Sequence, residues 1–172
     1  MILTGKEIHN EVIAGNIQIT PFDPSRINPN SYNLTLDSEL AVYDSKVLNA
    51  KKENTLEKFR LRDSGTAIQP GVLYLASTVE ETFTHKYVPI LSGRSSVGRL
   101  GISIHVTAGF GDIGFRGRWT LEIFCIQPVI IYPNMQICQI YFQEAKGEVN
   151  LYSGKYNNNS GIQESMIWKD FY

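Results

Sequence analysis

Cysteine is scarce in this sequence, which contains only two among its 172 residues. Cys125 and Cys138 both lie in apolar, strand-like runs, so we predict small buried side chains rather than a disulfide. No Cys-x-x-Cys pair occurs, and His9, His85 and His105 are far apart along the chain. These absences argue against a cysteine-based zinc site, and His105 is expected to form a hydrogen bond on a sheet face instead.

Strong net charge and long apolar runs are also missing. The formal net charge is −1, which gives no general attraction to nucleic acid or to an anionic membrane. No apolar run approaches the roughly 20 residues of a membrane-spanning helix. The first residues, MILTGKEIHNEV, lack the basic and then apolar layout of a signal peptide. We therefore expect a cytoplasmic protein that binds neither nucleic acid nor membrane.

Helical periodicity is confined to residues 4–14, where the sequence predicts one helix. Thr4 and Glu7 match a Thr-x-x-Glu capping box at its start. A short apolar face is expected from three residues: Ile8, Val12 and Ile13.

Short β-rich runs alternate with turn signals after the helix. The predicted strands cover residues 17–20, 32–36, 40–43, 66–68, 72–79, 87–92, 100–106, 119–126, 129–132 and 136–142. Many short strands at close spacing predict an all-β fold, a distorted antiparallel β-barrel or jelly roll, with one short N-terminal helix. We expect residues 1–143 to form this domain, residues 44–62 to be an exposed excursion, and the polar residues 144–172 to be a C-terminal tail.

Residues 93–122, GRSSVGRLGISIHVTAGFGDIGFRGRWTLE, hold most of the candidate site residues. Gly93-Arg94-Ser95-Ser96 is typical of a turn that exposes backbone N–H groups, hydroxyls and a guanidinium, which together can hold phosphate oxygens. The alternative is a plain serine turn with two solvated arginines, Arg94 and Arg99. Because neighbouring cations repel one another unless they share an anion, the residues alone leave both interpretations open.

Glu122 lies between apolar residues in the predicted strand 119–126, where an unpaired carboxylate costs free energy. It is either a structural carboxylate, paired with Arg116, Arg118 or a backbone amide, or a general acid and base. Asp112 follows a glycine, and aspartate is common in turns for purely local reasons. Its alternative is a role in the same site as Glu122.

Several segments resemble the dCTP deaminases, in particular the bifunctional, dUMP-forming members related to the trimeric dUTP diphosphatases. The matching segments are NPNSYNLTL at 28–36, IQPGVLYLASTVE at 68–80, SGRSSVGRLG at 92–101, HVTAGFGDIGF at 105–115, GRWTLE at 117–122, PNMQICQI at 133–140 and, more loosely, SGKY at 153–156. The resemblance spans nearly the whole chain in the family's order. It implies a dUTPase-like β-barrel for residues 1–143 and a lid for residues 144–172.

The resemblance also implies roles for individual residues. Glu122 of the TLE motif would be the catalytic residue, because one suitably tuned carboxylate can take a proton from water and deliver protons to the cytosine ring and the departing amine. Asp112 would meet the deoxyribose 3′-hydroxyl, and Thr120 with the backbone of 120–122 would contact the base edge. The implied substrate-binding residues are Arg94, Ser95, Ser96, Val97, Gly98, Arg99, Thr107, Asp112, Thr120, Leu121, Gln139, Tyr152, Lys155 and Asn159. Asn159 stands where the family has glutamine.

The loop before Asp112 distinguishes the subfamilies. Deaminases that stop at dUTP resemble HVTAHRID, whereas dUMP-forming members resemble HxTAGFID or HxTAGWID. Gly109 and Phe110 follow the second pattern, and Gly111 departs from it because isoleucine is usual there. The extra glycine is expected to make the loop more flexible.

The resemblance therefore implies a homotrimer with active sites shared between subunits, which converts dCTP to dUMP, pyrophosphate and ammonia and so supplies dUMP for dTMP synthesis. Mg²⁺ is the implied cofactor, bound through the triphosphate oxygens and not by protein side chains. A deaminase that releases dUTP is the main alternative. A dUTP diphosphatase without deaminase activity and a non-catalytic nucleotide-binding jelly-roll module are further alternatives.

Overall fold

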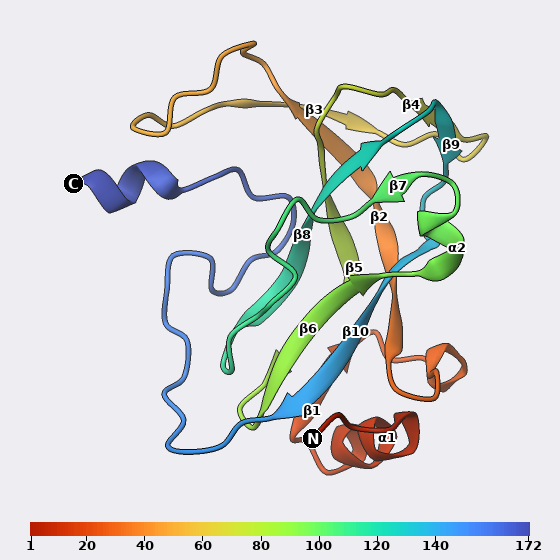
Figure 1. Ribbon diagram of the computed structural model, residues 1–172, viewed down its shortest axis with the longest axis vertical. Coiled ribbons are helices and arrows are strands. Elements are labelled where there is room, and N and C mark those ends of the chain that lie inside the picture. The colour runs from red at the N-terminus through yellow and green to blue at the C-terminus, as the bar shows by residue number, and fades with distance from the viewer.

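The computed structural model describes residues 1–172, and most of its regular structure is antiparallel β-sheet. The central path of the sheet has the order β6-β10-β2-β5-β8-β7 and nearly closes into a barrel (Figure 1). These strands are β6 (Tyr87–Gly93), β10 (Gln136–Glu144), β2 (Tyr32–Tyr43), β5 (Tyr74–Thr84), β8 (Arg116–Cys125) and β7 (Ile102–Ser103). The predicted antiparallel barrel is confirmed.

Shorter elements surround this path. β1 (Ile17–Thr20) pairs with β5, β3 (Leu56–Arg60) pairs with β2, and β4 (Thr66–Ile68) pairs with β9 (Val129–Ile131) in a separate sheet. The helical elements are α1 (Gly5–Ile13), the single turn α2 (Ser95–Gly98) and the 3-10 segments η1 (Pro24–Arg26) and η2 (Ile167–Phe171). None of the helices has the length and the hydropathy that crossing a bilayer requires.

The predicted N-terminal helix forms with a partly different buried face. The hydroxyl of Thr4 accepts a hydrogen bond from the N–H of Glu7 at 3.3 Å, as half of a capping box. Ile8 is fully buried, but Ile13 is 74% exposed, so its predicted place on the apolar face is wrong. Glu11 lies three residues after Ile8 and takes the buried position instead, because i and i+3 share a helix face.

Two predicted strand patterns differ from the structure. The runs 32–36 and 40–43 form one continuous strand, β2, whose pairing with β5 shifts register between Leu36 and Leu40. Such an irregularity lets polar residues interrupt the apolar pattern without ending the strand. The run 100–106 keeps only the two residues of β7, and the excursion 44–62 contains β3.

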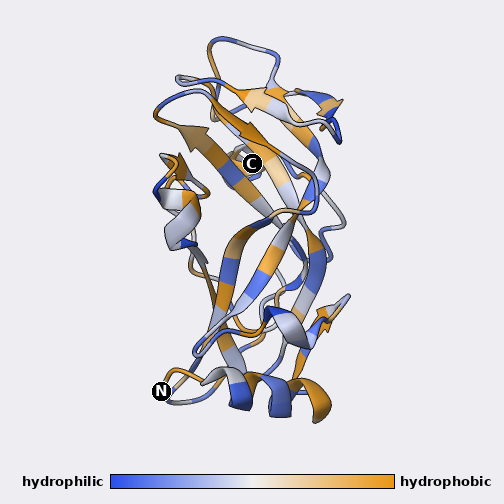
Figure 2. Ribbon diagram, turned by 90° about the vertical axis from the view of Figure 1, so that its right-hand side faces the viewer, coloured by the Kyte–Doolittle hydropathy of each residue, from blue (hydrophilic) through white to orange (hydrophobic).

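Alternating apolar residues fill the interior of the barrel. Figure 2 shows apolar and polar segments alternating along the strands. Tyr32, Leu34 and Leu36 of β2 are buried with Leu121 and Ile123 of β8. Cys125 and Cys138 are both buried and free, as predicted.

The C-terminal tail packs against the barrel. It covers residues 145–172, because Glu144 is the last residue of β10. It follows β10, passes back along β8 and ends in η2 on the same side of the molecule (Figure 1). The tail lies on the opposite side from α2, and this separation determines which predicted site residues come together.

Candidate active site

A pocket of about 450 Å³ opens between β8, the loop that precedes it and the C-terminal tail. Its size is typical of a site for a small organic molecule. Six of the predicted site residues line it: Thr107, Asp112, Thr120, Glu122, Tyr152 and Asn159. Phe110, half of the predicted subfamily signature, lines it as well.

Glu122 is held on the pocket wall by the backbone. Its Oε2 accepts a hydrogen bond of 2.8 Å from the N–H of Val106, while Oε1 accepts none from the protein. The backbone N–H of Glu122 donates to the carbonyl of Ile104 at 3.0 Å, which fixes the residue between two adjacent segments. One carboxylate oxygen is therefore oriented and the other is available to a ligand.

The two nearest arginines in the sequence do not neutralise Glu122. Arg116 forms an ion pair of 3.3 Å with Glu81 and stacks over the ring of Phe83, and Arg118 pairs with Asp37. Of the structural roles considered for Glu122, the backbone amide is present and the arginine pair is absent. Glu122 therefore lines the pocket without an ion pair of its own, an arrangement that often marks a functional carboxylate.

His105 lies beside this carboxylate. Its Nε2 is buried without a hydrogen-bond partner, so the predicted hydrogen bond does not form through that atom. Burial lowers the pKa of His105, and the negative charge of Glu122 acts in the opposite direction. The imidazole is therefore neutral at pH 7 and does not supply a positive charge to the pocket.

Asp112 is exposed at the mouth of the pocket. Its backbone carbonyl closes a turn by accepting from the N–H of Phe115 at 3.2 Å, but its carboxylate forms no hydrogen bond within the protein. An aspartate that served only the turn would bond its side chain to the local backbone. The carboxylate is instead free to meet a ligand, as is the hydroxyl of Thr107.

The loop 109–111 is tied to β6 by two backbone hydrogen bonds. The N–H of Leu91 donates to the carbonyl of Gly109 at 2.7 Å, and the N–H of Gly111 donates to the carbonyl of Pro89 at 2.9 Å. A Cβ on Gly109 would lie 2.6 Å from the Leu91 carbonyl oxygen, so the close approach of the two segments requires glycine. Gly111 is buried, and a Cβ added there would lie 3.0 Å from the carbonyl oxygen of Pro89.

Aromatic residues that the sequence did not single out complete the pocket. The ring of Trp119 lies 4.6 Å from that of Phe115, and its Nε1 donates to Thr82 at 2.8 Å. Tyr156 of the SGKY segment also lines the pocket, and other lining residues that were not predicted include Tyr43, Arg118, Gln163, Glu164 and Ser165. Arg118 and Trp119 belong to the quoted GRWTLE segment, whereas no local signal marks residues 163–165.

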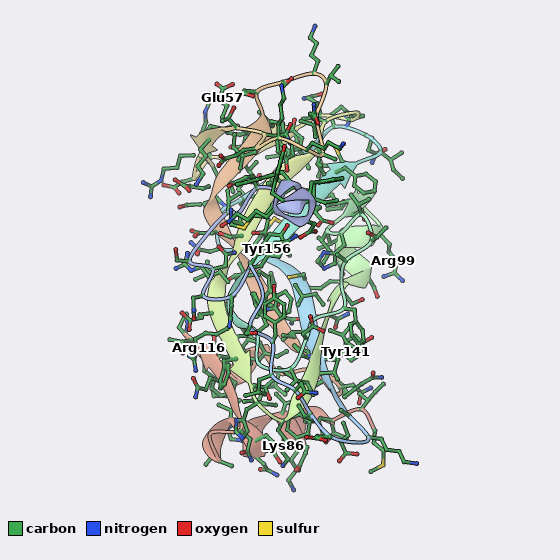
Figure 3. All side chains as sticks on the ribbon, turned by 90° about the vertical axis from the view of Figure 1, so that its left-hand side faces the viewer. Glu57, Lys86, Arg99, Arg116, Tyr141 and Tyr156 are labelled. Atoms are coloured by element: carbon green, nitrogen blue, oxygen red, sulfur yellow. The ribbon has the colours of Figure 1, made fainter.

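The predicted phosphate-binding residues lie elsewhere. Residues 94–99 form α2 and its flanks and do not line the pocket. Arg99 lies at the edge of the molecule, away from Tyr156 on the face that carries the tail (Figure 3). Ser95, Ser96 and Arg99 are exposed with no side-chain hydrogen bond, whereas Arg94 donates to the carbonyl of Gln136 at 2.9 Å.

Val97 of this segment and three further predicted residues also lie outside the pocket or present only backbone to it. The side chains of Val97 and Leu121 are buried in the core, so only their backbone could meet a ligand. Gln139 accepts from Ser31 at 2.7 Å and donates to the carbonyl of Gly93 at 3.0 Å, beside α2. Lys155 forms an ion pair with Asp170.

Metal ligands are not gathered at either place. No three His, Cys, Asp or Glu side chains come close enough together to hold an ion. A cage built by the protein alone does not fit these residues. An ion carried on the oxygens of a bound triphosphate fits them better, because such an ion needs few protein ligands.

Comparisons with known proteins identify relatives of this chain. A family model described as dCTP deaminase-like matches residues 2–145. A protein of Hathewaya histolytica named "dCTP deaminase, dUMP-forming" is 58% identical over 172 residues, which are 99% of each chain. A protein of the same name from Clostridium botulinum (strain Eklund 17B / Type B) is 60% identical with the same coverage.

One solved structure supports the fold. The crystal structure of 2′-deoxycytidine 5′-triphosphate deaminase from Agrobacterium tumefaciens matches with a TM-score of 0.67 at 19% identity. The match covers 84% of this chain and 48% of that one.

Proposed function

The chain belongs to the dCTP deaminase family, and we infer that it is a dUMP-forming dCTP deaminase, a hydrolase that converts dCTP to dUMP, pyrophosphate and ammonia. Relatives that match along the full length carry this name. The alternatives of a dUTP-releasing deaminase, a dUTP diphosphatase alone and a silent binding module are therefore set aside. A cytoplasmic location stays a prediction.

Glu122 is the residue that we propose as the general acid and base. The observation that carries this role is a carboxylate with one oxygen held by the Val106 N–H and the other free in the pocket. In this position it can take a proton from a water that attacks C4 of cytosine and deliver it to the ring nitrogen. It can then take the proton of the hydroxyl added at C4 and deliver it to the departing amine. Arg118 is paired with Asp37 and forms no ion pair with Glu122.

Replacing Glu122 with glutamine tests this role. Glu122→Gln keeps the shape and can still accept from Val106, but it cannot take up a proton. Deamination is expected to fall by roughly 10²- to 10⁴-fold, the usual contribution of general acid–base catalysis, while dCTP still binds. Glu57→Gln, on an exposed carboxylate of β3, is the matched control and should keep full activity. Near-native turnover of Glu122→Gln would make Glu122 structural.

The deoxyribose is assigned to the mouth of the pocket. The free carboxylate of Asp112 and the hydroxyl of Thr107 both line this region. Asp112 can accept a hydrogen bond from the 3′-hydroxyl and can also orient the second water, which attacks the α-phosphate in the step that forms dUMP. Phe110 is 68% exposed, and it presents an uncharged ring beside Asp112 where dUTP-releasing enzymes carry a cation.

The triphosphate is assigned to residues 94–99 and Gln139 of a neighbouring subunit. The exposed Arg99, Ser95 and Ser96 offer unpaired donors, which suit phosphate oxygens. Because these groups lie outside the pocket of their own chain, a complete site needs a second copy. This supports the homotrimer with shared active sites that the resemblance implies, since a cyclic assembly brings one surface of each subunit to a different surface of the next.

Mg²⁺ is the proposed cofactor and would reach the site on the triphosphate. When bound there, it would neutralise part of the phosphate charge and stabilise the departing pyrophosphate. Arg99, Ser95 and Ser96 would hold the same phosphate groups from the protein side.

The tail, residues 144–172, is proposed as a lid over the barrel of residues 1–143. Tyr152 and Tyr156 line the pocket, and the ring of Tyr152 lies 6.2 Å from that of Phe115. An aromatic wall of this kind can cover a pyrimidine ring and exclude bulk water. Lys155 would have to leave Asp170 to reach a phosphate.

A further inference from the structure

The tail adds a short strand-like segment to β8. Gly117 and Asn159 form an isolated parallel bridge, and the N–H of Arg118 donates to the carbonyl of Asn159 at 2.8 Å. The N–H of Asn158 donates to the carbonyl of Arg116 at 2.7 Å. A Cβ on Gly117 would lie 2.6 Å from the carbonyl oxygen of Asn159, so only glycine allows the tail this close.

The side-chain amide of Asn159 forms hydrogen bonds within this arrangement through both its nitrogen and its oxygen. Its Nδ2 donates to the carbonyl of Gly161 at 2.7 Å and to the carbonyl of Arg118 at 2.9 Å, which engages both hydrogens. Its Oδ1 accepts from the N–H of Gly161 at 3.3 Å. An amide in this state has no hydrogen left for a nucleotide unless the tail detaches from β8.

The hydroxyl of Thr120 is used in the same way. It accepts from the N–H of Gln163 at 3.1 Å and lies 3.3 Å from Nδ2 of Asn159. It donates to the carbonyl of Gly161 at 3.4 Å. The sequence predicted that Thr120 contacts the base, but in the structure its polar atom faces the tail.

The tail beyond this contact forms part of the pocket. Ile162 is 7% exposed and packs on Ala41 and Leu75 of the barrel. The next three residues, Gln163, Glu164 and Ser165, line the pocket together with Glu122. Anchoring at Thr120 and Asn159 therefore sets where this wall of the pocket lies.

We propose that Thr120 and Asn159 are positioning residues, which hold residues 157–165 against β8 and so build the tail wall of the substrate pocket, rather than contacts to the nucleotide. The proposal deepens the function assigned above. It rests on that function only in treating the pocket as the substrate site. The contact itself exists within one chain and can be measured without substrate.

A pair of variants at Thr120 separates the two roles. Thr120→Val removes the hydroxyl at nearly constant volume, whereas Thr120→Ser keeps it. Loss of hydrogen bonds to the tail should speed hydrogen–deuterium exchange of peptides spanning 157–166 by roughly two- to tenfold in Thr120→Val. Thr120→Ser should exchange like the native protein. Ser160→Ala, an exposed neighbour whose side chain forms no hydrogen bond, is the control in the same segment.

Steady-state kinetics give a second reading. If the wall is displaced, Thr120→Val should raise KM for dCTP several-fold with little change in kcat, because binding is lost equally in ground and transition states. Thr120→Ser should restore KM. General loss of folded protein would instead lower kcat at constant KM.

Unchanged exchange in Thr120→Val would overturn the proposal, and a raised KM with unchanged exchange would make Thr120 a direct base contact. If Thr120→Val does not fold, Asn159→Asp carries the test, because it removes both donors and should speed exchange in the same peptides. If the proposed function failed and no variant turned over dCTP, the exchange result would still decide the positioning role.

Discussion

A Cβ atom added to Gly111 would overlap Cη2 of Trp119 and lie 3.0 Å from the carbonyl oxygen of Pro89. The indole cannot easily move away, since its Nε1 donates to Thr82 and its ring packs on Phe115. The family pattern has isoleucine at position 111. Glycine at this position leaves the space that the indole of Trp119 occupies. It allows close packing beneath the loop that carries Asp112.

We expect Gly111→Ile to lower the free energy of unfolding by about 1–3 kcal/mol through overpacking. Trp119→Val in the same chain should recover part of the loss, with a coupling of roughly 0.5–3 kcal/mol. Urea unfolding at one fixed protein concentration measures all four members of the cycle. Strictly additive effects would show that the two positions do not share space in solution.

Most strands could be predicted because their residues alternate locally. β1 and β4 have the predicted bounds, and the core residues of β2 and β10 carry the period-two pattern. β8 starts at Arg116, earlier than predicted, because its first residues pair with Glu81 and Phe83 and this partner is distant in the sequence. β7 ends early, since beyond it Ile104 and Val106 bond to Glu122 instead of continuing a regular ladder.

Site residues could be predicted from the sequence where they lie close together in one segment. Contacts between segments that are distant in the sequence could not. Glu122 and Asp112 lie in one motif-rich stretch, and the structure places both in the pocket. The anchoring of the tail depends on Thr120 and Asn159, which are 39 residues apart. Neither residue has a local pattern that indicates this contact.

Acid should destabilise the protein partly through His105. Burial holds its folded-state pKa below the ordinary value near 6.5. The unfolded chain therefore takes up a proton that the folded chain refuses, and the stability from neutral His105 is present above about pH 6.5 and lost as pH falls below it. We expect His105→Asn to show a smaller drop in unfolding free energy between about pH 7.5 and 5.5.

Glu122→Gln should change the pH dependence of stability in the opposite direction from His105→Asn. The charge of Glu122 raises the pKa of His105, so its removal should make the protein more sensitive to acid. Urea unfolding at both pH values measures the three proteins. Equal pH dependence in the native protein and His105→Asn would remove His105 from the explanation.

Loss of Arg99 should weaken binding of dCTP. A charge-assisted bond to phosphate contributes roughly 1.5–3 kcal/mol, so Arg99→Ala should raise Kd about tenfold or more. Arg62→Ala, an exposed arginine on the turn before β4 with no side-chain hydrogen bond, is the matched control. Calorimetry with dCTP and deoxycytidine makes the comparison, and similar affinity of the native protein for both ligands would contradict a phosphate site.

The carboxylate of Asp112 should matter for the second hydrolysis. Asp112→Asn keeps a hydrogen-bonding side chain but is a much weaker base for orienting the water that attacks the α-phosphate. Pyrophosphate release from dCTP should slow, and dUTP should accumulate where the native protein yields dUMP. Ion-exchange separation of products over time, in the presence of Mg²⁺, measures both. Unchanged pyrophosphate release would remove Asp112 from this step.

Assayed at dCTP well below KM, where weakened binding limits the Arg99→Ala rate, mixed oligomers should turn over dCTP faster than either parent variant. Glu122→Gln lacks the proposed acid and base, and Arg99→Ala lacks part of the proposed phosphate site, which lies outside the pocket of its own chain. If each site combines Glu122 of one subunit with Arg99 of another, random mixing at equal amounts leaves about a quarter of the sites intact. The two variants, unfolded together and refolded, should then turn over dCTP at about that fraction of the native rate, whereas mixtures refolded separately should not. Sites built within one chain would give no recovery, because every chain in the mixture carries one of the two defects.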